Sequence, residues 1–126
     1  RELCCVAGGP YLYEDALTDD LLMIRDLEEI GQKAEALGIH PIYLTLPPLN
    51  PANIQKAFDE PTADNWRQSF AQVNAYIRSR DHIDVAAQFD EQKDLPTELA
   101  LDGLHGDWNM KQIMAQAINT AMAGRV

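Results

Sequence analysis

Hydrophobic and polar positions follow two patterns along this chain: short continuous apolar runs, and longer stretches with a helical period. Three apolar runs, at residues 3–7, 41–46 and 82–86, predict short strands; the first is expected to be buried on both faces and the second to be buried. The first run ends at Gly8-Gly9-Pro10 and the second at Pro47-Pro48, and both endings are typical of turns.

Amphipathic helices are predicted where apolar residues recur every three or four positions. The predicted helices cover Asp19–Leu37, about Ala63–Arg80, and the stretch that starts near Asp107. Trp66 and Phe70 share one face of the second helix, which favours core packing over a binding role. We expect a polar loop between Gln88 and Leu101, with room for a helical turn.

Strands and helices therefore alternate, which predicts one α/β domain over residues 1–126 with a parallel sheet. A helix of this length between two strands favours a right-handed crossover. In such sheets, ligands bind beyond the carboxyl ends of the strands. Three segments are expected to meet at that edge, namely residues 8–11, 45–48 and 102–105.

Charge and composition narrow the possible partners. The formal net charge is −10, without a basic stripe, so a nucleic acid partner is not expected. No apolar run is long enough for a membrane span. Cys4 and Cys5 are adjacent, which favours two free thiols and a reducing compartment, so we expect a soluble, cytoplasmic protein. The three histidines lack clustered carboxylates, and neither a metal nor another cofactor is expected.

The most informative motif is Asp102-Gly103-Leu104-His105, directly before the last predicted helix. A carboxylate three residues from an imidazole can hold that ring in one tautomer and stabilise its charged form, as a general base requires. The alternative is an ordinary turn, since Asp and Gly are common turn residues.

The order of these features resembles the C-terminal part of the SGNH (GDSL-type) hydrolases. The residues that carry the resemblance are Gly8-Gly9, Leu46-Pro47-Pro48, Asn74, Asp84 and Asp102-Gly103-Leu104-His105. The resemblance implies a three-layer α/β fold with a parallel, flavodoxin-like sheet whose N-terminal strands are missing. It also implies an ester hydrolase in which His105 is the general base and Asp102 orients it. Gly9, Tyr11 and Pro47 would border the oxyanion and substrate pocket.

The sequence departs from the family pattern at the nucleophile. Its only serines, Ser69 and Ser79, fall inside the second predicted helix, and the family's Gly-Asp-Ser segment would lie upstream of Arg1. Where the family has Gly-x-Asn-Asp, with the Asn side chain donating to the oxyanion, this chain has Gly9-Pro10-Tyr11-Leu12, and Pro10 has no N–H to replace the lost donor. Tyr11 carries an O–H that could reach the pocket, although packing is the more common role of such a residue.

A chain that begins at Arg1 and soon enters an apolar run is typical of a processed product or a fragment. In that case Leu3–Ala7 would be an open sheet edge, which predicts pairing with the missing N-terminal portion or a homo-oligomer formed through this strand. The function expected from the resemblance is hydrolysis of a small acyl ester, with the serine supplied from outside the chain. The alternative is a degenerate, non-catalytic binding or interaction domain.

Overall fold

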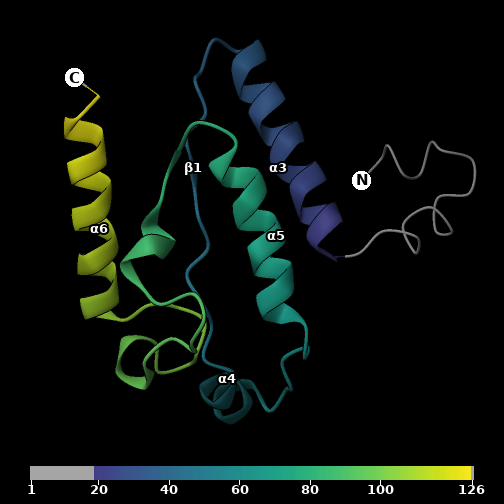
Figure 1. Ribbon diagram of the computed structural model, residues 1–126, viewed down its shortest axis with the longest axis vertical. Helices are drawn as coiled ribbons and strands as arrows, with labels where there is room; N and C mark the ends of the chain where they lie inside the picture. Colours follow the sequence, from purple (N-terminus) through teal and green to yellow (C-terminus); the bar gives the residue numbers. More distant parts are fainter. Residues whose placement is uncertain (1–18, 126) are drawn as a thin grey trace, which may run out of the picture. The chain divides into compact units, whose positions relative to one another are not determined.

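The computed structural model of this chain describes residues 19–125 (Figure 1). The described part of the chain divides at His40 into two compact units, and each is described by itself. The prediction of a single domain over 1–126 stays a prediction. Within the described residues, no helix is both long and apolar enough to span a bilayer.

Within its described residues, 19–40, the first unit contains one helix, α3, at Asp19–Ala36. Its end agrees closely with the predicted Asp19–Leu37 helix, because Gly38 adopts a positive φ of 76° just beyond it. The N–H groups of Gly38 and Ile39 donate to the carbonyls of Glu35 and Ala34, which closes the last turn of the helix.

The second unit is built around two very short strands, β1 (Tyr43–Leu44) and β2 (His82–Ile83), which pair in parallel. Helices α5 (Trp66–Arg78) and α6 (Trp108–Ala123) lie on either side of this pair (Figure 1). Contacts between α5 and β1 include the ring pair of Tyr76 and Tyr43, and α6 packs on β2 and on the 3₁₀ turn that follows it. Almost fully buried side chains fill the space between these elements: Val73, Ile77, Ile83, Val85 and Ala86.

The predicted three-layer α/β fold with a parallel sheet is wrong for the described residues. They form four α-helices and only two strands of two residues each. The second apolar run shortens because Pro47-Pro48 ends it and because the backbone of Leu46 is bonded to a side chain of α5. The third run leaves the strand at Asp84 and enters the 3₁₀ helix η1 (Val85–Gln88). The predicted strand Leu3–Ala7, and with it the predicted pairing edge, lies outside the described residues.

Helix α4 (Pro51–Phe58) was not predicted, because its Pro/Asn-rich start has the composition of a loop. The Oδ1 atom of Asn50 accepts a hydrogen bond from the N–H of Asn53 and caps the helix. Pro51 follows at the first helical position, where its missing N–H costs nothing. Asn50-Pro51 is therefore a helix start, and the sequence does contain that signal.

The segment between η1 and α6 is mostly irregular, with one short 3₁₀ helix, η2, at Thr97–Leu99. A small core cluster anchors it, formed by the buried Leu95, Ala100 and Met110. Asp107 caps α6 as its sequence predicts, accepting a hydrogen bond from the N–H of Met110 at 3.1 Å. The loop that ends with residues 102–105 is thus attached to the core at both of its ends.

Candidate functional site

Asp102 and His105, hereafter the Asp–His pair, contact each other directly. The Nδ1 atom of His105 lies 2.8 Å from Oδ2 of Asp102. The other carboxylate oxygen, Oδ1, accepts hydrogen bonds from the backbone N–H groups of Leu104 at 2.8 Å and His105 at 2.7 Å. Both oxygens of Asp102 are therefore occupied, one by the turn and one by the imidazole.

These contacts strongly favour the ionised form of Asp102. The hydrogen bond from His105 Nδ1, reinforced by the N–H groups of His105 and Leu104, lowers the pKa of Asp102 to about 2. An ionised carboxylate at this position accepts a hydrogen bond from Nδ1–H, so the lone pair of the neutral imidazole is on Nε2.

The imidazole is open to approach from outside. The side chain of His105 is 75% exposed, whereas that of Asp102 is 30% exposed. Within residues 19–125, no hydroxyl or thiol donates a hydrogen bond to the ring of His105. The described part of the site thus has a base, most of whose side chain is exposed, and its orienting carboxylate.

Gly103, inside the pair, is pressed against the start of α4. Its carbonyl accepts the N–H of Asn50 at 3.0 Å, and its φ is +81°. An added Cβ at Gly103 would overlap the carbonyl oxygen of Asn50 and would lie 2.6 Å from Cγ1 and 2.7 Å from N of Ile54. Only glycine fits here, and the close approach holds the turn against a helix.

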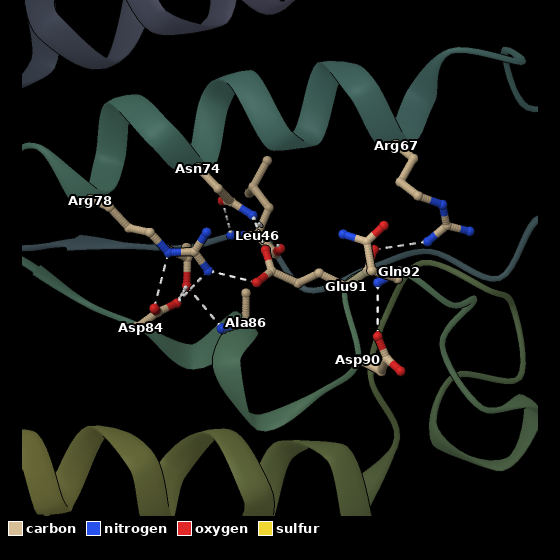
Figure 2. Close-up of polar contacts among 10 residues, drawn as sticks. Leu46, Arg67, Asn74, Arg78, Asp84, Ala86, Asp90, Glu91 and Gln92 are labelled. Carbon is tan, nitrogen blue, oxygen red and sulfur yellow. Dashed lines mark hydrogen bonds and ion pairs between the residues drawn. The ribbon is translucent and has the colours of Figure 1, made fainter.

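A second polar cluster joins α5, the end of β1 and the start of the irregular segment (Figure 2). Arg78 binds Asp84 side-on, with Nε at 3.0 Å from Oδ2 and Nη2 at 2.9 Å from Oδ1, and its Nη2 also reaches Glu91 at 2.8 Å. The hydrogen bond to Asp84 and then that to Glu91 raise the pKa of Arg78. The hydrogen bond from Arg78 also lowers the pKa of Asp84.

Asn74 and Thr45 complete this cluster. The buried amide of Asn74 accepts from the N–H of Leu46 at 2.7 Å and donates to its carbonyl at 3.0 Å, as a neighbouring strand would (Figure 2). Thr45 donates to Asp84 at 2.8 Å and accepts from the N–H of Ala86 at 2.9 Å. Asn74 and Asp84, which support the family resemblance, therefore hold the end of β1, α5 and the segment after β2 together.

A pocket of about 160 Å³ opens beside this cluster. Its apolar wall includes Trp66, Phe70 and Pro48, and its polar wall includes Arg78 and Glu91. The Trp66 and Phe70 rings pack edge to face with centroids 5.3 Å apart, but both are only half-buried and line this pocket, so they do not belong to the buried core. The carboxylate oxygens of Glu91 are both bonded to protein groups, Asn74 and Arg78, so this polar wall is mainly structural.

Of the other residues predicted for the oxyanion and substrate pocket, only Pro47 lies within the described residues. Gly9 and Tyr11 lie outside the described residues. Pro47 is half-buried, and its neighbours Leu46 and Pro48 line the pocket beside α5. Ser69 lies in α5 and Ser79 caps its C-terminal end, where its hydroxyl donates to the carbonyl of Tyr76 at 2.5 Å. Within residues 19–125, no group of three metal-ligating side chains is present.

Comparisons with protein families, with curated proteins and with solved structures give no significant match to this chain.

Proposed function

We propose that the Asp–His pair is the general-base half of an ester hydrolase. The observation that carries the proposal is the 2.8 Å contact between His105 Nδ1 and Asp102 Oδ2, combined with an imidazole that is 75% exposed. In this arrangement Asp102 holds the ring, and Nε2 of His105 takes a proton from a hydroxyl nucleophile.

The nucleophile comes from outside residues 19–125, because Ser69 and Ser79 both belong to α5 or its cap. A serine that hydrogen-bonds to Nε2 of His105 would complete the catalytic group, and its acyl-enzyme would then be hydrolysed by a water that the same imidazole activates. The substrate class that fits this chemistry is a small acyl ester. The Asp-Gly-Leu-His resemblance supports the same reaction.

The test is hydrolysis of p-nitrophenyl butyrate by the natural full-length protein and its His105→Ala variant. Loss of the base is expected to lower kcat by about 100-fold or more. His82→Ala is the matched control, because His82 lies at the start of β2, where its Nδ1 is 2.7 Å from the carbonyl of Arg80. Equal rates for the wild type and His105→Ala would exclude the proposed role.

A second candidate function, binding without catalysis, is favoured by the apolar surface around His105. Leu101 is 74% exposed, Leu104 is 50% exposed and Trp108 is 73% exposed. An open groove of about 520 Å³ continues from Trp108 along α6. An apolar surface of this kind is typical of interaction sites. Absence of ester hydrolysis by the natural full-length protein, together with loss of partner binding in its Trp108→Ala variant, would favour this function.

A further inference from the structure

Two buried asparagines at the start of α4, Asn50 and Asn53, bind the segment that leads into the Asp–His pair. We call these two residues the asparagine clamp. Their exposed fractions are 7% and 5%. Nδ2 of Asn50 donates to the carbonyl of Leu95 at 2.7 Å. Nδ2 of Asn53 donates to the carbonyls of Ala100 at 3.0 Å and Thr97 at 3.3 Å. Three carbonyls of one short segment are therefore held by two amide groups.

Helix capping alone does not require these amide groups. The cap of α4 uses only Oδ1 of Asn50, and a serine or threonine hydroxyl would serve the same purpose. Asn53 lies inside the helix, where asparagine is a poor helix former. The feature that distinguishes both residues is a buried N–H₂ group that points at the segment 95–100, and such donors are costly to bury without an acceptor.

The clamp is connected to the pair through two hydrogen bonds. The carbonyl of Ala100 accepts both from Asn53 and from the N–H of Gly103, the latter at 2.9 Å. The backbone N–H of Asn50 donates to the carbonyl of Gly103 at 3.0 Å. Both peptide groups of Gly103 are thereby fixed by contacts that end on α4. Gly103 follows Asp102 directly, so the direction of the carboxylate depends on these contacts.

We propose that Asn50 and Asn53 are positioning residues of the candidate site, which hold the Asp102–His105 turn in the geometry that joins carboxylate and imidazole. The expected effect on ester hydrolysis rests on the proposed function, whereas the expected effect on the contact between Asp102 and His105 does not. A base must be held within a fraction of an ångström of its working position, and that accuracy comes from rigid elements behind the site.

Two variants that preserve α4 test the clamp. Asn53→Ala keeps a good helix former and removes the donor to Thr97 and Ala100. Asn50→Ser keeps a capping oxygen and removes the donor to Leu95. Ile77→Val is the control, because it loosens the core of α5 without touching the clamp.

The measurements are NMR titrations of the Asp102 carboxyl carbon and of the His105 ring nitrogens in the folded protein. In both clamp variants we expect the pKa of Asp102 to rise from about 2 toward its ordinary value, and the fraction of the ring with its proton on Nδ1 to fall. Ile77→Val is expected to change neither. In the natural full-length protein, the clamp variants should lower kcat for the ester about 10- to 100-fold.

These measurements separate the two proposals. If the clamp variants move the NMR signals while His105→Ala keeps full ester hydrolysis, the clamp stands and the proposed function fails. If the variants are folded, as judged by the dispersion of their amide signals, and the pKa of Asp102 and the tautomer of His105 are unchanged in both, the clamp does not position the pair and the inference is overturned.

Discussion

Replacing Gly103 with alanine should destabilise the unit of residues 41–125 more than an ordinary glycine substitution does. A non-glycine residue at a φ of +81° costs about 1–2 kcal/mol. The added Cβ would also overlap the Asn50 carbonyl oxygen and come within 2.6 Å of a side-chain atom of Ile54. Overpacking of this kind costs about 1–3 kcal/mol more. The expected loss in the free energy of unfolding is roughly 2–5 kcal/mol.

Gly38→Ala is the matched control for this prediction. Gly38 has a similar φ of +76°, but no atom lies within 4 Å of the position of its Cβ. Its substitution should therefore cost only the conformational part, about 1–2 kcal/mol. Urea denaturation followed by circular dichroism measures both variants, each in the transition of the unit that carries the glycine. Equal losses for the two variants would refute the argument that Gly103 is held by close contact with α4.

Three further predictions concern charge and capping. Because the pKa of Asp102 in the folded protein lies below its usual value, the stabilising contribution of Asp102 should be complete above about pH 4 and should be lost as the pH falls toward 2. The test is to measure the free energy of unfolding as a function of pH in the wild type and in Asp102→Asn. Parallel curves for the two proteins would contradict the prediction. Arg78→Leu should cost about 1–2 kcal/mol in urea denaturation, since it leaves the carboxylate of Asp84 half-buried without its partner, whereas Arg80→Leu on the exposed surface should cost less than about 0.5 kcal/mol. Asp107→Ala removes the cap of α6 and should lower stability by about 1 kcal/mol, seen as a loss of helical signal on heating, and an unchanged melting temperature would contradict it.

The helices show how much of this fold local sequence signals contain. Helical spacing of apolar residues located α3, α5 and α6 to within a few residues at most ends, and the cap at Asp107 was found from residue type alone. The start of α4 at Asn50-Pro51 also has a local signal, but its proline and asparagine favoured a loop in the sequence interpretation. Such elements depend on interactions between residues a few positions apart, which the sequence displays directly.

The sheet was predicted incorrectly because strands depend on distant partners. The apolar runs at 41–46 and 82–86 do pair in parallel, yet only two residues of each take part. Beyond them, side chains take the place of a strand: the N–H and carbonyl of Leu46 are bonded to Asn74, and the N–H of Ala86 is bonded to Thr45. Side chains that replace a strand in this way are 28 and 41 positions distant in the chain, so a local pattern does not reveal them.

The candidate site likewise depends partly on local sequence signals and partly on contacts between distant residues. The sequence by itself determined that Asp102 and His105 lie in one turn before a helix, because a spacing of three residues with a glycine between them is a local property. Only the tertiary structure decided what holds that turn. Asn50 and Asn53 are about 50 positions upstream, and their side-chain amides bond to backbone carbonyls, which every residue possesses. Residue 103 must be glycine because it lies against the start of α4, a helix that the sequence pattern did not predict. Backbone acceptors carry no sequence signature, and so the support of the pair became visible only in the folded chain.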